Sequence, residues 1–116
     1  LACAVAKAAL EVVIEENLAS NAEKLGAYFR NKMNEYISKS DLVTLVRGKG
    51  LLNAIVINDD EKSSTAWDLC VKMKMNGLLA KPTHGNIIRF APPLVINKDQ
   101  LDTCIDIIIS SIEEYS

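Results

Sequence analysis

The stretch that decides the fold is VTLVRGKGLLNAIVI, residues 43–57. It holds two runs rich in β-branched residues, Val43 to Val46 and Leu51 to Ile57, and such runs are typical of strands. Between them lies Arg47-Gly48-Lys49-Gly50, whose glycines reach at little cost the backbone angles of a tight reversal. The stretch therefore predicts a β-hairpin. Because a hairpin joins antiparallel neighbours, it excludes a purely parallel sheet.

Helical periodicity lies on both sides of this hairpin. Apolar residues recur at steps of three and four over residues 18–37, which predicts a long amphipathic helix, and the same spacing predicts an opening helix that ends near Asn17. Another helix is predicted over residues 63–76, and Asn97 with Gln100 forms a capping box for a last helix. The polar residues of the 18–37 helix, which we expect to face solvent, are Glu23, Lys24, Arg30, Asn31, Lys32 and Glu35.

Two further strands are expected between the last two helices. Leu78 to Lys81 is predicted as a strand, residues 82–86 as a turn-rich loop, and Ile87 to Ala91 as a strand that Pro92-Pro93 ends, because proline cannot donate to a sheet ladder. The predicted order is helix, helix, strand, strand, helix, strand, strand, helix. This order predicts an α+β fold, a two-layer sandwich of helices packed on one face of a small, largely antiparallel sheet.

Composition describes one ordinary globular domain over residues 1–116, with 49% hydrophobic and 24% charged residues. A formal charge of -2 without any basic block argues against a nucleic-acid partner. No apolar run is long enough to span a membrane. The three cysteines lack metal-ligand spacing, so we expect free thiols, no metal site, and an intracellular location in the cytoplasm or the mitochondrial matrix.

Four polar side chains occupy apolar or turn settings and are the candidates for chemistry: Arg89, Lys81, His84 and Arg47. Strand alternation puts Ile88 and Phe90 on one face and Arg89 on the other. A guanidinium among apolar residues needs an anion or water. Two interpretations stay open: a structural arginine, tied to an internal acid or reaching solvent from an edge strand, and a bidentate clamp for a substrate carboxylate.

The other candidates have weaker claims. His84 is the single histidine, and it is either a turn residue or an acid–base group. Lys81 is either a charged lysine at a strand end or, if desolvated, a Schiff-base lysine, and Arg47 is interpreted as turn-exposed or structural. No complete catalytic constellation is predicted, so these residues by themselves make at most a binding surface.

Three segments resemble a known enzyme family. The Arg-Gly-Lys-Gly-Leu hairpin at 47–51 and the Ile-Arg-Phe-Ala-Pro-Pro-Leu segment at 88–94 resemble the class III, fold-type I pyridoxal-phosphate-dependent aminotransferases. Gly-Leu-Leu-Ala-Lys-Pro-Thr-His-Gly at 77–85 is similar to the ornithine aminotransferases within that class. The resemblance extends over essentially the whole chain, including Ala-Glu-Lys-Leu-Gly at 22–26, and corresponds to the C-terminal small domain of a longer aminotransferase. An opening helix without a capping residue fits such a piece.

The resemblance implies transfer of the δ-amino group of ornithine to 2-oxoglutarate, giving glutamate 5-semialdehyde and glutamate, in a homodimer that uses pyridoxal phosphate. In this family the arginine matching Arg89 receives a substrate carboxylate. The family's Schiff-base lysine, pyridine-pairing acid and phosphate loop have no match here, so no catalytic or cofactor-binding residue is expected and the chain alone should be inactive. The alternatives are a class III aminotransferase for acetylornithine or γ-aminobutyrate, and a non-catalytic module that binds an amino acid as a regulatory signal through Arg89.

Overall fold

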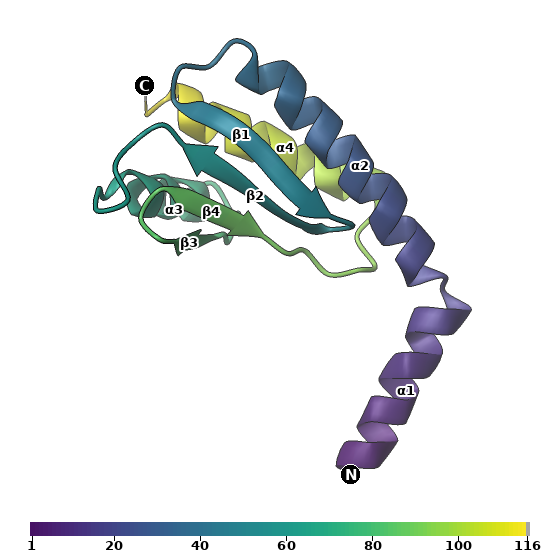
Figure 1. Ribbon diagram of the computed structural model, residues 1–116. Coiled ribbons are helices and arrows are strands. Elements are labelled where there is room, and N and C mark those ends of the chain that lie inside the picture. The colour runs from purple at the N-terminus through teal and green to yellow at the C-terminus, as the bar shows by residue number, and fades with distance from the viewer. Residues whose placement is uncertain (116) are drawn as a thin grey trace.

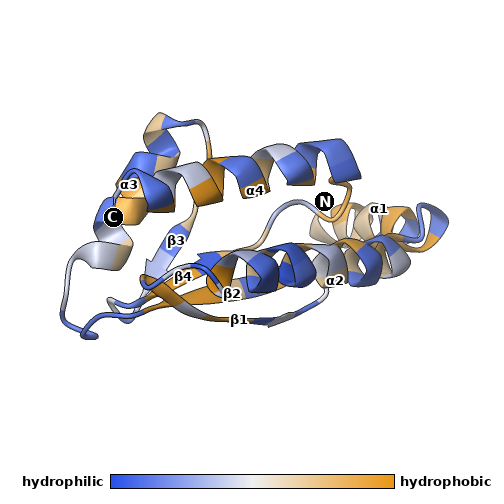
Figure 2. Cartoon of the chain, turned by 90° about the horizontal axis from the view of Figure 1, so that it is seen from above, coloured by the Kyte–Doolittle hydropathy of each residue, from blue (hydrophilic) through white to orange (hydrophobic). Residues whose placement is uncertain are grey.

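The computed structural model describes residues 1–115 and has the predicted α+β architecture and element order (Figure 1). The strands form one antiparallel sheet in the order β1-β2-β4-β3. The last three helices pack on one side of this sheet, and Figure 2 shows α3 and α4 lying together on that side. No described helix packs on the other side, which we call the open face. The elements are α1 (Ala2–Glu15), α2 (Leu18–Ile37), β1 (Val43–Lys49), β2 (Leu52–Ile57), α3 (Thr65–Met75), β3 (Lys81–Thr83), β4 (Ile87–Phe90) and α4 (Lys98–Glu113).

The covered face of the sheet builds the core. Ile55 and Ile57 of β2 and Ile88 of β4 are at most 1% exposed, because strand alternation turns them all toward the helices. Each such side chain contributes about 1.5–3 kcal/mol through its removal from water. The predicted last helix is confirmed as α4, which buries an apolar stripe made of Leu101, Ile105, Ile108 and Ile112.

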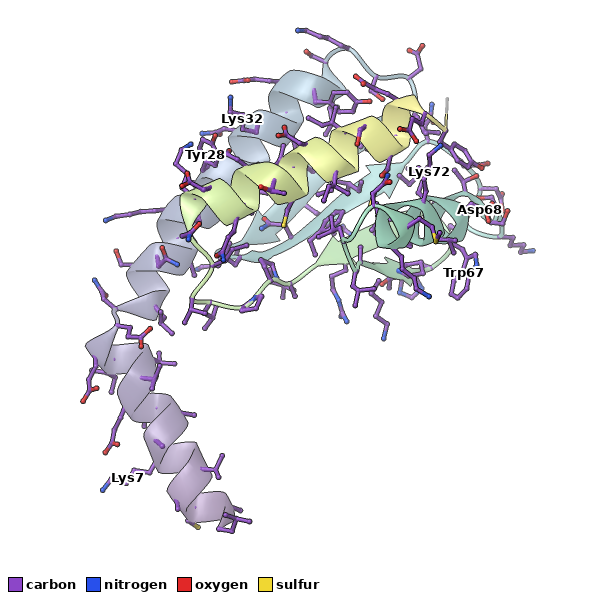
Figure 3. The ribbon with its side chains drawn as sticks, turned by 180° about the vertical axis from the view of Figure 1, so that it is seen from behind. Lys7, Tyr28, Lys32, Trp67, Asp68 and Lys72 are labelled. Atoms are coloured by element: carbon purple, nitrogen blue, oxygen red, sulfur yellow. The ribbon has the colours of Figure 1, made fainter. Side chains whose placement is uncertain are left out.

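The first helix projects away from the rest of the chain (Figure 1). None of its residues is buried, and its apolar side chains Val5, Leu10 and Ile14 are each at least 60% exposed. The predicted break near Asn17 is confirmed: this residue has φ 51 and ψ 43, a left-handed conformation that asparagine adopts more readily than most residues. In Figure 3, Lys7 marks this isolated helix, far from the layered body.

The first hairpin is tighter than predicted. Arg47 and Lys49 continue the ladder of β1 opposite β2, so the prediction that Arg47 lies in the turn is wrong, and only Gly50 and Leu51 make the reversal. Gly48 permits this extension because a Cβ there would lie 2.3 Å from a carbonyl oxygen of β2. The shorter turn carries Arg47 onto a strand, where alternation fixes its direction.

The third strand begins three residues later than predicted: the assignment of residues 78–80 to a strand is wrong, and Lys81 alone of the predicted range belongs to it. Leu78 instead donates its N–H to the carbonyl of Met73 at 2.8 Å, behind a left-handed Gly77 with φ 95. This arrangement is a helix C-cap, so Leu78 belongs to the end of α3 and not to a strand. The strand that follows is short, lies at the sheet edge and contains Pro82, as the missing N–H of proline requires.

Candidate substrate-binding site

Four residues form one row across the open face. Arg47 pairs with Ala54 in β2, Ala54 pairs with Arg89 in β4, and Arg89 pairs with Lys81 in β3. Residues directly opposite one another on neighbouring strands point to the same face of a sheet. We call these four positions the cationic row, because three carry permanent or near-permanent positive charge and the fourth is a small alanine.

Arg89 is exposed and has no internal anion. Within residues 1–115, no carboxylate lies within 4 Å of its guanidinium and no hydrogen bond engages it. The interpretation of Arg89 as half of an internal salt bridge is therefore wrong, and because β4 lies between β2 and β3 it is not an edge strand either. What remains is a guanidinium that meets either solvent or an anion from outside the described chain.

Lys81 lies on the edge strand directly opposite Arg89. Its side chain is exposed and, like Arg89 and Arg47, it has no ion pair or hydrogen bond in the described residues. Exposure is the setting of an ordinary charged lysine. A Schiff-base lysine needs a desolvated pocket, so that interpretation of Lys81 has no support.

His84 makes the turn between β3 and β4. It has φ 55 and Gly85 has φ 74, and these two successive left-handed residues let the three-residue loop 84–86 reverse the chain between Thr83 and Ile87. Gly85 also lies against the backbone of Glu61, whose carbonyl oxygen would be 1.8 Å from an added Cβ. The imidazole is exposed and no described acid or nucleophile bonds to it. The structure therefore brings His84 to the hairpin tip and not to the cationic row.

Hollows in the surface lie on the helix side. One of about 1020 Å³ follows the junction of α2 and α4, and one of about 240 Å³ lies beneath the segment that joins β4 to α4. Neither includes a residue of the cationic row. Among residues 1–115, no group of three or more His, Cys, Asp or Glu is arranged to hold a metal, and no helix is long and apolar enough to cross a bilayer. Among the described residues, the candidate site is therefore an open sheet surface and not an enclosed pocket.

Arg30 contradicts its predicted place on the solvent-facing side of α2. Its Nη1 donates to the carbonyl of Gly50 at 3.0 Å and to Oδ1 of Asn53 at 2.9 Å, and Nδ2 of Asn53 donates to the same carbonyl at 3.1 Å. Asn53 is only 3% exposed. A polar residue at an inward strand position was the signal in the sequence, because such a group requires internal partners. These bonds fix the end of the hairpin that carries Arg47.

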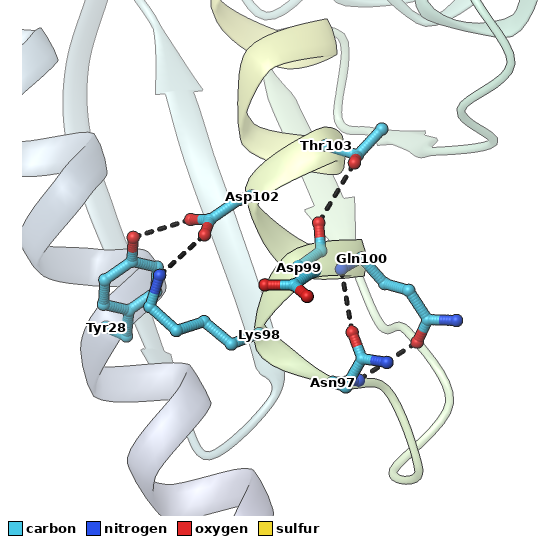
Figure 4. A network of polar contacts seen from close by, with 7 residues as sticks. All are labelled: Tyr28, Asn97, Lys98, Asp99, Gln100, Asp102 and Thr103. Carbon is cyan, nitrogen blue, oxygen red and sulfur yellow. Dashed lines mark hydrogen bonds and ion pairs between the residues drawn. The ribbon is translucent and has the colours of Figure 1, made fainter.

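A second polar cluster ties α2 to α4 on the helix layer (Figure 4). Nζ of Lys98 donates to Asp102 at 2.7 Å, the hydroxyl of Tyr28 donates to the other carboxylate oxygen at 2.6 Å, and Lys98 lies 4.6 Å from the centre of the Tyr28 ring. The hydrogen bond from Lys98, and after it the bond from Tyr28, lowers the pKa of Asp102. The cluster explains the packing of two helices and contributes nothing to the open face.

Comparison with known proteins identifies the family to which the chain is similar. Residues 1–112 match the family described as Aminotransferase class-III. The chain is 58% identical over 112 residues to the mitochondrial ornithine aminotransferase of Drosophila melanogaster, a match that covers 97% of this chain and 25% of that protein. The chain thus spans about a quarter of the length of such relatives.

Solved structures agree in fold. A structure described as acetylornithine aminotransferase from Elizabethkingia anophelis superposes with a TM-score of 0.95 at 64% identity, over 97% of this chain and 30% of that one. The ornithine δ-aminotransferase of Plasmodium falciparum superposes with a TM-score of 0.85 at 44% identity, over 92% of this chain and 28% of that one. Since the family match extends over nearly all of its residues, the chain belongs to the class-III aminotransferases.

Proposed function

We propose that the chain is the C-terminal small domain of an aminotransferase that moves the δ-amino group of ornithine to 2-oxoglutarate, and that Arg89 receives a substrate carboxylate. The observation that carries the proposal is an exposed arginine without an internal anion, on a sheet face where no described helix packs. Relatives named ornithine aminotransferase support the choice of substrate.

A guanidinium suits this task because its planar fork donates two parallel hydrogen bonds to one carboxylate. Such a clamp fixes the direction of the substrate as well as its position, so that binding is converted into alignment of the reacting carbon. The flanking Ala54 leaves space beside Arg89, and the hydrogen bonds of Arg30 keep the neighbouring hairpin in place. The remainder of the longer protein supplies the opposite wall.

Family membership implies pyridoxal phosphate in the parent enzyme, and the described residues do not fit a pocket for it. Every lysine in residues 1–115 is exposed or half-buried, and the least exposed, Lys72, has a side chain 30% exposed and is paired with Glu114 at 3.2 Å. A lysine that carries the cofactor needs a desolvated setting. We therefore assign no chemical step to this chain. When the chain is mixed with pyridoxal phosphate and borohydride, we expect no stoichiometric adduct, and trapping of one adduct per chain would contradict this.

The test of Arg89 uses the whole parent enzyme, assayed with ornithine and 2-oxoglutarate. Arg89→Lys keeps the charge but loses the fork, and we expect kcat/KM to fall by about 100-fold, because loss of one charged hydrogen bond to the substrate costs up to about 3 kcal/mol. Lys74→Gln, which removes one exposed charge from α3 on the helix side, is the matched control and should leave kcat/KM within twofold. An unchanged kcat/KM for Arg89→Lys would refute the assignment.

Acetylornithine is the second candidate substrate, and the 64% identity to a structure bearing that description favours it. Parallel assays of the parent enzyme with ornithine and N-acetylornithine separate the two, because the acetyl group removes a cation. A higher kcat/KM for N-acetylornithine would overturn the ornithine assignment and leave the role of Arg89 in place.

The parent enzyme is proposed to be a homodimer located in the mitochondrial matrix or the cytoplasm. The exposed apolar side chains of α1 support burial of this helix in the longer protein, since a projecting helix of this kind is marginal by itself in water. Calorimetry of the isolated chain with ornithine or 2-oxoglutarate tests the regulatory-module alternative. We expect no micromolar binding, because half a cleft leaves the ligand hydrated.

A further inference from the structure

We propose that Lys81 is the second cation of the Arg89 site and that it favours the dianionic 2-oxo acid over the diamino acid. This inference rests on the proposed function, because it concerns the substrates of the same site. Nothing in the sequence alone joins the two residues, because the register that pairs their strands is a tertiary feature.

The register of the sheet places the two cations together. Lys81 and Arg89 are direct cross-strand partners on the open face, which puts their Cα atoms about 5 Å apart. Both are exposed, and no carboxylate of residues 1–115 lies within 4 Å of either one. Like charges in this arrangement repel each other and raise the free energy of the fold. An anion bound between them removes that penalty, so the pair is a binding site for negative charge.

Arg47 is a different case although it shares the row. It is two strands from Arg89, and therefore about 10 Å away, with Ala54 between them. A carboxylate held at Arg89 touches Lys81 before it touches Arg47. The local pair is thus Arg89 with Lys81, and Arg47 contributes to the general positive potential of the face.

The two substrates differ in charge at this pair. 2-Oxoglutarate carries two carboxylates and no cation, whereas ornithine carries one carboxylate and two ammonium groups. A second positive charge attracts the first molecule more strongly than the second, because the ammonium groups of ornithine are repelled. Removal of Lys81 should therefore weaken binding of 2-oxoglutarate and leave binding of ornithine nearly unchanged.

The experiment compares Lys81→Gln, Lys81→Arg and the control Lys74→Gln in the whole parent enzyme. For Lys81→Gln we expect the KM for 2-oxoglutarate to rise about tenfold, as for loss of one charged hydrogen bond, and the KM for ornithine to stay within twofold. Lys81→Arg should stay within about threefold of wild type for both substrates, and Lys74→Gln should change neither KM. Equal changes in both KM values, or no change in either, would overturn the proposal.

Unreactive competitors separate this inference from the proposed function. The dianion glutarate should inhibit Lys81→Gln about tenfold more weakly than wild type. Inhibition by the monoanion pentanoate should be weakened by a smaller factor. If the wild-type enzyme prefers another amino donor, the substrate assignment fails. Inhibition by glutarate still tests the role of Lys81 in that case. Weaker inhibition of the variant by glutarate supports the cation pair, and unchanged inhibition overturns it.

Discussion

Gly26→Ala tests how closely α2 packs on the first hairpin. An added Cβ at this helical position would lie 1.7 Å from the carbonyl oxygen of Gly50, whereas ordinary contact needs more than 3 Å. The obstacle is backbone, so it cannot rotate away. Either the helix or the hairpin has to move, and the same oxygen accepts a hydrogen bond from Arg30 that joins the two, together with one from Asn53 within the hairpin.

The magnitude follows from three contributions. Alanine is better than glycine inside a helix by about 1 kcal/mol. Overpacking costs about 1–3 kcal/mol, and displacement of the charged hydrogen bonds of Arg30 costs about 1.5–3 kcal/mol. The free energy of unfolding should therefore fall by about 1.5–5 kcal/mol, and Tm by on the order of 10 °C. Urea denaturation followed by circular dichroism measures the first quantity and a thermal scan the second.

Gly77→Ala is the matched control, because the same substitution at this position destabilises the fold through backbone strain and not through a steric clash. An added Cβ there meets nothing within 4 Å, but φ is +95, so the cost is backbone strain of about 1–2 kcal/mol. A double-mutant cycle adds a second check: Arg30→Gln should cost less in the Gly26→Ala background than in wild type, because the displaced helix has already lost those bonds. A Gly26→Ala chain as stable as wild type, or more stable, would refute the close packing.

Three further predictions concern caps and titrations. Asn97→Ala should lower the free energy of unfolding by about 1 kcal/mol in urea, because it removes the observed capping box; no loss would contradict the cap. Burial raises the pKa of the Cys70 thiol to about 11, so the unfolded chain loses this proton first; stability should decline as pH rises from about 9 toward 11, and the decline should be smaller in Cys70→Ala, with an unchanged decline contradicting the role of Cys70. The hydrogen bond from Lys98 lowers the pKa of Asp102 more than the bond from Tyr28, so Lys98→Gln should raise this pKa further than Tyr28→Phe in a carbon-detected NMR titration, and the reverse order would contradict it.

Much of the fold could be predicted because its signals are local. The capping box at Asn97 and Gln100 needs only two residues with the right spacing, and the break at Asn17 needs only a residue that tolerates the left-handed conformation. The alternation around Arg89 likewise predicted correctly that its side chain lies on the face opposite to the buried Ile88 and Phe90. Each of these features depends on neighbours in the chain and not on tertiary contacts.

The errors arose where tertiary pairing decided the outcome. The glycines of the first hairpin indicated a reversal but not its length, because the ladder with β2 absorbed Arg47 and Lys49. Arg30 occupies a polar helical position that periodicity assigns to solvent, yet it reaches across to a turn twenty residues later. Strand register also could not be predicted from one sequence, and register alone makes Lys81 a neighbour of Arg89.

The residues on the two faces of the sheet serve different purposes, one folding and the other binding. The covered face satisfies folding alone, since every inward residue of β4 is apolar and buried. The open face places Lys81 opposite Arg89 without an acid, and for folding alone a β-branched or oppositely charged pair would be more stable. A local conflict of this kind is expected where a surface serves binding. The unbalanced charge is therefore most simply explained as one half of an ionic contact, whose other half comes from a ligand or from the rest of the longer protein.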